Sequence, residues 1–122
     1  MISGITQQTI DTPDGAAAVV LSPHGELDLA SIASLDSAVT SALRAAGPQP
    51  RLIVDLSDVS LLQPVVVGVL LEARRRCRNA GGATVLVVTA PEISATLADV
   101  EVAPLFPTAP ELHAAVQRVS DR

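Results

Sequence analysis

The sequence predicts an α/β fold, because short apolar runs of strand length alternate with longer segments in which apolar residues recur at helical spacing. Strands that alternate with helices at these lengths form βαβ units with right-handed crossovers, which build an open sheet layered with helices. The chain has 122 residues, enough for one hydrophobic core and too few for two ordinary domains. We therefore expect a single domain over residues 1–122.

Five segments are expected to form strands, chiefly because they are apolar runs bounded by turn residues. They are residues 5–10, 16–21, 51–56, 83–88 and 104–107. The first is an edge strand that ends at the turn 12–15, and the second ends at Ser22-Pro23, before a turn at Gly25. The third is apolar on successive residues, as in a central strand covered on both faces.

Four segments are expected to form helices. In the first, apolar residues recur at helical spacing up to the closing pair Gly47-Pro48; they are Ile32, Leu35, Val39, Leu43 and Ala46. The second begins at Pro64, which suits a first helical turn, and ends at residues 79–82. Its predicted inward face consists of Val66, Val69, Leu70, Ala73 and Cys77. The third spans residues 91–97. The fourth begins at Ala109, and its apolar side consists of Leu112, Ala115, Val116 and Val119.

The composition argues against several classes of function. Phe106 is the one aromatic residue and the net charge is -5, which leaves little stacking surface or positive charge for nucleic acid. No apolar run approaches the roughly 20 residues that span a bilayer, and the N-terminal segment lacks the pattern of a signal peptide, so we expect a cytoplasmic protein without membrane insertion. Cys77 is alone, and His24 and His113 are far apart in sequence, so we expect no disulfide, metal site or cofactor.

Three short motifs carry a resemblance to a known family. They are Gly25-Glu26-Leu27-Asp28, Asp55-Leu56-Ser57 and Gly68-Val69-Leu70-Leu71, the last followed by the turn Gly81-Gly82. In their order and spacing, from about Ile5 to Val119, they resemble the STAS domains of bacterial anti-sigma factor antagonists. The resemblance implies an α/β STAS fold, with a mixed sheet of four to five strands and about four helices.

The segment that acts as a phosphorylation switch in the resembled family differs in this sequence. In that family, Asp, Ser, Ser and Gly stand at the start of the second helix, and a partner kinase phosphorylates a serine just after the Asp. By the resemblance, Gln63, Pro64, Val65 and Val66 occupy these positions, and none of them has a hydroxyl group. Two hypotheses follow: a surface locked in the unphosphorylated state, or a domain that lost the switch and kept its fold as a scaffold.

The altered switch segment is also the predicted partner-binding surface. At least one of Val65 and Val66 should face outward beside Leu61 or Leu62 and form a small apolar patch, unless all the valines pack under the neighbouring loop. In the resembled family, the turn that holds Glu26 and Asp28 lies near the switch, although Asp28 could equally cap the first helix. The predicted partner-binding residues are Glu26, Asp28, Ser60, Leu62, Gln63, Pro64, Val65 and Val66.

Two further groups of polar residues have open interpretations. Ser60 is either a displaced phosphorylation site or simply a polar turn residue. The second helix carries a basic run of four arginines, Arg74, Arg75, Arg76 and Arg78. A helix spreads consecutive residues around its circumference, so a solvated face, with Glu72 and Asp36 among its partners, is the default interpretation. Docking of an anion or of an acidic partner is the alternative.

The resemblance implies an anti-sigma factor antagonist-like regulator of transcription that acts by protein–protein docking and is not an enzyme. Its expected partner is an anti-sigma factor or a kinase-like regulatory protein, and a homodimer is a further alternative. Two other functions stay open: a STAS subunit or scaffold of a larger assembly such as a transporter complex, and a nucleotide-binding domain. The nucleotide-binding alternative lacks support from a Walker-type or Gly-rich phosphate loop in the sequence.

Overall fold

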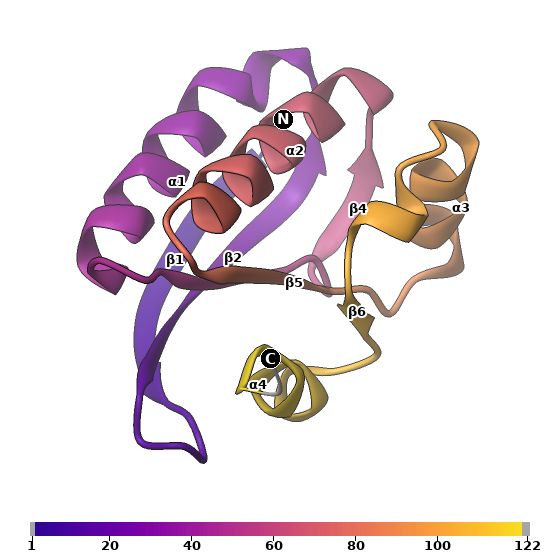
Figure 1. Cartoon of the computed structure of the whole chain (residues 1–122). Helices are drawn as coiled ribbons and strands as arrows, with labels where there is room; N and C mark the ends of the chain where they lie inside the picture. Colours follow the sequence, from indigo (N-terminus) through magenta and orange to yellow (C-terminus); the bar gives the residue numbers. More distant parts are fainter. Residues whose placement is uncertain (1, 121–122) are drawn as a thin grey trace.

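The computed structural model describes residues 2–120 and contains one mixed β-sheet with helices on both faces (Figure 1). The strands are β1 Ile2–Asp11, β2 Ala17–Leu27, β3 Arg51–Asp55, β4 Val59–Leu62, β5 Ala83–Val87 and β6 Thr108–Ala109. Their order across the sheet is β1-β2-β3-β5-β6, and β4 pairs with the end of β2. β1 and β2 are antiparallel, whereas the other pairs are parallel.

Four α-helices and two short 3-10 helices connect the strands. They are η1 Leu29–Ser31, α1 Ile32–Ala46, α2 Pro64–Asn79, α3 Pro91–Asp99, η2 Ala103–Leu105 and α4 Leu112–Ser120. Figure 1 shows α1 and α2 side by side over one face of the sheet and α4 on the other face. The predicted α/β class, mixed sheet and four helices are therefore confirmed, with six strands in the described residues instead of four to five.

The hydrophobic core has two parts, one on each face of the sheet. The larger part joins the sheet to α1, α2 and α3, and the smaller part joins it to α4. Successive residues of a central strand point to opposite faces. Leu21 and Leu52 accordingly belong to the larger part, and their neighbours Val20 and Ile53 belong to the smaller. This explains why the central strands carry apolar residues at successive positions, as the sequence predicted for 51–56.

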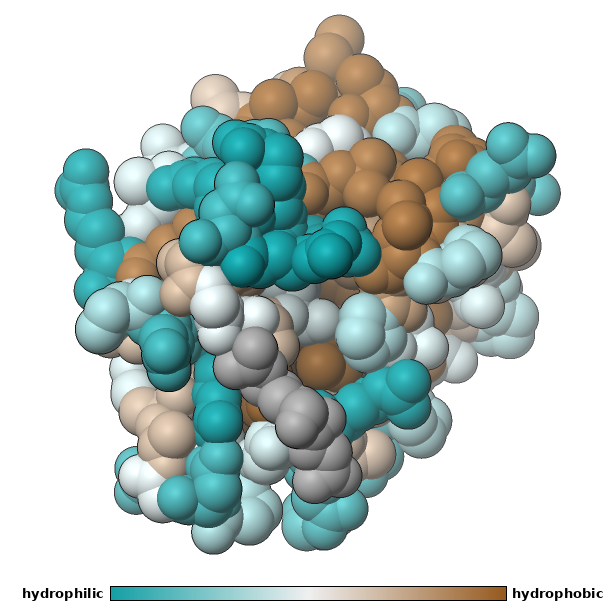
Figure 2. Space-filling view, in the orientation of Figure 1, coloured by the Kyte–Doolittle hydropathy of each residue, from teal (hydrophilic) through white to brown (hydrophobic). Residues whose placement is uncertain are grey.

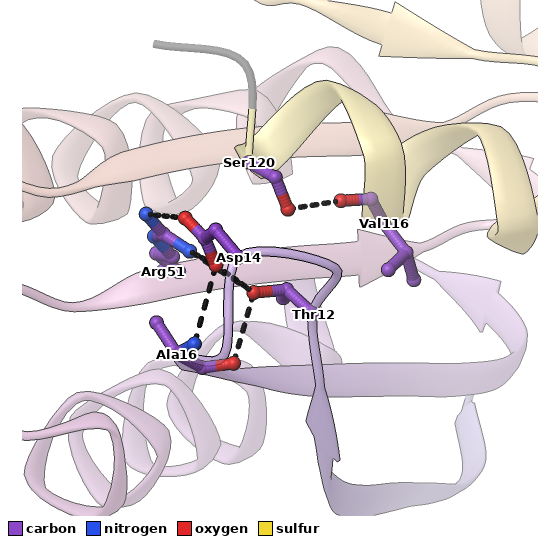
Figure 3. Close-up of polar contacts among 6 residues, drawn as sticks. All are labelled: Thr12, Asp14, Ala16, Arg51, Val116 and Ser120. Atoms are coloured by element: carbon purple, nitrogen blue, oxygen red, sulfur yellow. Dashed lines mark hydrogen bonds and ion pairs between the residues drawn. The ribbon is translucent and has the colours of Figure 1, made fainter.

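An ion pair ties the hairpin between β1 and β2 to β3 (Figure 3). Arg51 donates from both terminal nitrogens to the Asp14 carboxylate, at 2.8 Å and 2.6 Å. The Thr12 hydroxyl donates to the same carboxylate and to the Ala16 carbonyl oxygen. Because Arg51 and Thr12 both stabilise the ionised carboxylate, the pKa of Asp14 lies well below its usual range. The predicted turn 12–15 is thus confirmed and is anchored to the neighbouring strand.

The second strand is longer than predicted. β2 continues past Pro23 to Leu27, so Gly25 and Glu26 lie in a strand and not in a turn. A proline interrupts most strands because it lacks an amide hydrogen. Here Pro23 falls between the stretch of β2 that pairs with β3 and the stretch that pairs with β4, so no ladder bond is lost on that edge.

Three other predicted boundaries were wrong. Residues 59–62 form β4, where we expected a turn, because they pair with the extension of β2. Residues 104–107 are not a strand: they overlap η2, and the last strand is the short β6 at 108–109. The final helix begins at Leu112 and not at Ala109, because Ala109 belongs to β6.

Candidate docking surface

The start of α2 is held against the end of β2 by Gln63. This residue caps the helix from an extended conformation and precedes Pro64 in the first turn. Its backbone N–H donates to the Leu27 carbonyl oxygen at 2.9 Å. Its side-chain Oε1 accepts a hydrogen bond from the Leu29 N–H at 3.1 Å. The segments before α1 and before α2 are therefore joined side by side, although they are 34 residues apart in sequence.

Asp28 caps the short helix η1 that precedes α1. Its carboxylate accepts a hydrogen bond from the Ser31 hydroxyl at 2.8 Å, and its N–H donates to the same hydroxyl oxygen at 3.2 Å. The capping alternative for Asp28 is thus the one that the contacts support. Glu26, at the end of β2, is exposed and lies opposite Leu61 in the register of β2 with β4. Both carboxylates accordingly border the start of α2.

Exposed apolar side chains gather at the same place. Val65 is 51% exposed and Leu29 is 68% exposed, and Leu61 extends this apolar area beside Glu26. Figure 2 shows apolar side chains over the upper part of the molecule, above the start of α2. The predicted apolar patch is therefore present, with Val65 as its member from α2. We call the set of Glu26, Asp28, Leu29, Ser60, Leu61, Gln63, Pro64 and Val65 the helix-start surface.

Two of the predicted partner-binding residues are not on this surface. Leu62 and Val66 are buried in the larger part of the core, at 2% and 0% exposure. Val67, which the predicted inward face of α2 omitted, is buried with them, and Val69 is only partly buried. Leu62 and Val66 could reach a partner only if the packing under α2 opened.

The helix-start surface can present shape and apolar area but little reactive chemistry. Ser60 on β4 carries an exposed hydroxyl, whereas Gln63, Pro64 and Val65 carry none. Within residues 2–120, no three His, Cys, Asp or Glu side chains are grouped as a metal site would require. In the same part of the chain, no helix has the length and apolar character to cross a bilayer.

The order of the elements and the mixed sheet match a described family. The family model for the STAS domain matches residues 7–115 of the chain. The chain belongs to the STAS family. No curated protein matches this STAS domain.

Several solved structures share the fold of this STAS domain. An anti-sigma factor antagonist from Mycobacterium paratuberculosis is 24% identical, with a TM-score of 0.79 over 97% of this chain and 96% of that chain. The anti-sigma factor antagonist SpoIIAA in its unphosphorylated form is 19% identical, with a TM-score of 0.75 over 98% of each chain. The phosphorylated form of SpoIIAA from Bacillus gives a TM-score of 0.65 at 19% identity, over 91% of this chain and 96% of that chain. At these identities the likeness is one of fold.

The arginine run on α2 of the STAS domain does not form one patch. Arg75 pairs with Glu72, with its Nε at 2.9 Å from the carboxylate, as the solvated interpretation predicted. Arg76 donates to the Thr40 hydroxyl of α1 at 3.2 Å. Arg74 donates to the Leu105 carbonyl oxygen, which follows α3 in the chain, at 2.6 Å. Arg74, Arg75 and Arg76 therefore contact three different neighbours, and none of the four arginines lies on the helix-start surface.

Proposed function

We propose that this STAS domain is an anti-sigma factor antagonist-like regulator that acts in the cytoplasm by docking, without enzymatic activity. Its partner on this proposal is an anti-sigma factor or a kinase-like regulatory protein, and the docking site is the helix-start surface. The single observation that carries the proposal is the half-exposed Val65 in the first turn of α2, two residues after Gln63, to which the exposed Leu29 is hydrogen-bonded. Apolar side chains exposed together in this way are typical of interaction sites.

The proposal includes the loss of the phosphorylation switch. In the family resemblance, serines stand where this chain has Pro64 and Val65, and neither residue can accept a phosphate. A phosphate at this position would add about two negative charges to a contact surface. A surface without an acceptor would stay competent for docking whatever the activity of a partner kinase.

A charge at Val65 tests the docking site. Val65→Asp imitates the charge of a phosphate, and a carboxylate in the first turn is compatible with the helix because the helix dipole favours it by about 0.3–1 kcal/mol. If Val65 is an interface anchor, the Val65→Asp protein should lose about 2 kcal/mol of binding free energy, so that its affinity for the partner falls roughly 30-fold. The measurement is calorimetric titration against each purified anti-sigma factor of the source organism, after circular dichroism has shown that the variant is folded.

Gln117→Asp is the matched control. It places a carboxylate at an exposed position on α4, on the opposite face of the sheet, and should leave the affinity unchanged. A folded Val65→Asp protein that binds as tightly as the unmodified protein would rule out the helix-start surface. If no anti-sigma factor binds the unmodified protein, the partner class is wrong, and the alternative of a subunit in a larger assembly gains support.

The absence of a switch has its own test. After incubation with ATP and each kinase that binds the protein, mass spectrometry should find no phosphate at Ser60. Ser60 is the exposed hydroxyl of β4, three residues before Gln63. Phosphate on Ser60 would mean that the phosphorylation site has moved along the chain. The proposal that phosphorylation does not regulate this docking surface would then be wrong.

A further inference from the structure

A surface cavity of about 350 Å³ lies at the far end of α2 from the helix-start surface. It opens where the end of α2, the start of β5, the segment around η2 and the end of α4 meet. Three arginines line it: Arg74 and Arg78 from α2, and Arg118 from α4. No acidic side chain of the described residues lines it. Three of the eight basic residues of a chain with net charge -5 thus share one cavity.

None of the three arginines is neutralised by a carboxylate in residues 2–120. Arg51 and Arg75, by contrast, are paired with Asp14 and Glu72. Arg74 uses its Nε to hold the Leu105 carbonyl oxygen, which fixes the guanidinium at the cavity wall and leaves its two terminal nitrogens for other acceptors. The cavity is therefore positively charged, and it presents N–H donors that make no hydrogen bond within the described part of the fold.

The remaining wall is partly apolar and contains one unsatisfied group. Leu105, which is exposed, and Phe106, which is buried, form the apolar side. Thr84 of β5 is a buried lining residue, and its hydroxyl makes no conventional hydrogen bond within the described residues. The Cys77 thiol beside it is only a weak hydrogen-bonding partner. A buried hydroxyl without a good partner carries a free-energy penalty, so a polar group that reached the Thr84 hydroxyl would relieve it.

We propose that this cavity binds a small phosphate monoester, with the phosphate between the three guanidinium groups and the organic part against Leu105 and Phe106. Guanidinium groups form bidentate, charge-assisted hydrogen bonds with phosphate oxygens. The volume lies at the lower end of the range for ligand pockets, which fits a small molecule. The site is separate from the proposed docking surface, since Val65 and Arg78 are about 20 Å apart along the axis of α2 at 1.5 Å per residue.

The arginines also have a simpler explanation, which the test must separate from binding. Arg78 and Arg118 lie in the last turns of their helices, where a positive charge interacts favourably with the helix dipole. That role does not account for Arg74, which lies a turn earlier, or for the convergence of two helices on one cavity. The negative ends of the helix dipoles also work against an anion, so its affinity would depend on the guanidinium groups themselves.

The experiment is calorimetric titration of the full chain with phenyl phosphate, inorganic phosphate and phenol, in Tris buffer. Phenyl phosphate should bind with one-to-one stoichiometry, inorganic phosphate more weakly, and phenol not at all. Arg78→Gln and Arg118→Gln should each weaken phenyl phosphate binding by about ten-fold or more, because each removes charge-assisted hydrogen bonds to the phosphate. Arg75→Gln is the matched control, since it removes the same charge from the same helix outside the cavity.

Several results would overturn the proposal. If neither phosphate compound binds, or if Arg75→Gln weakens binding as much as Arg78→Gln, the cavity is not a phosphate site. If inorganic phosphate binds as tightly as phenyl phosphate, the organic part of the ligand is not recognised. If Arg78→Gln and Arg118→Gln lower the melting temperature and leave binding unchanged, the arginines serve only the helix ends.

Discussion

The same Gly→Ala substitution should have opposite effects at two glycines near the two ends of α2. Gly68 is exposed in the second turn of α2, and a Cβ atom there meets no atom within 4 Å. Glycine in a helix interior is less favourable than alanine by about 1 kcal/mol, because its backbone has more freedom to lose on folding. Gly68→Ala should therefore raise the free energy of unfolding by about 1 kcal/mol.

Gly82 follows the end of α2 and is buried against the chain before β3. A Cβ atom there would overlap the Pro50 carbonyl oxygen and would lie 2.7 Å from the Pro50 carbonyl carbon. The same oxygen accepts the Ala83 N–H at 3.0 Å, so relief of the overlap would strain this hydrogen bond as well. Overpacking costs about 1–3 kcal/mol, and a weakened hydrogen bond about 1 kcal/mol. Gly82→Ala should therefore lower the free energy of unfolding by about 2–4 kcal/mol.

Urea unfolding followed by far-ultraviolet circular dichroism measures both variants, since the chain has no Trp or Tyr for fluorescence. The free energies of unfolding of the two variants should differ by about 3–5 kcal/mol with similar denaturant slopes. A Gly82→Ala protein with an unchanged midpoint would refute the close approach of β5 to Pro50. A Gly68→Ala protein that is less stable than the unmodified protein would refute the exposed helical setting of Gly68.

Two further predictions concern the core and the hairpin. In the same unfolding experiment, Leu70→Ala should lower the free energy of unfolding by about 2–5 kcal/mol, because Leu70 on α2 is fully buried. Arg75→Ala should leave the unfolding midpoint unchanged within its error, because Arg75 is exposed. A larger loss of stability for Arg75→Ala than for Leu70→Ala would overturn the assigned faces of α2. The lowered pKa of Asp14 in the folded state means that its ion pair with Arg51 stabilises the protein above about pH 4 and loses this effect as the pH falls below that value. The gap in stability between the unmodified protein and Asp14→Asn should thus be constant near neutral pH and narrow in acid, and a gap independent of pH would contradict the ion pair.

The elements that the sequence predicted well are those that local patterns determine. The helical spacing from Ile32 to Ala46 gave α1 its observed bounds, and Pro64 marked the first turn of α2. β4 could not be predicted in this way, because four residues are too few for a clear alternation. It forms because the end of β2 offers an unpaired edge, a contact between segments far apart in sequence.

The same limit applies to the candidate docking surface. Glu26, Gln63, Pro64 and Val65 could be assigned from the resemblance to the family, and all belong to the helix-start surface. Leu29 was missed, because its place depends on the long-range hydrogen bond of its N–H to Gln63. A run of apolar residues does not by itself show which member faces the core. Val66 was correctly predicted on the inward face of α2, but both it and Leu62 were also assigned to the partner-binding surface, from which they are buried.

The three valines at the start of α2 have different roles, two in the hydrophobic core and one on the surface. β-Branched residues are mediocre helix formers, so each needs another reason for its position. Val66 and Val67 have one, since both are buried and contribute to the larger part of the core. Val65 remains half exposed, and neither helix propensity nor core packing explains it. Contact with a partner would account for a valine that is exposed on the same surface as Leu29, and Val65 is therefore the position at which a substitution can change binding without changing the core.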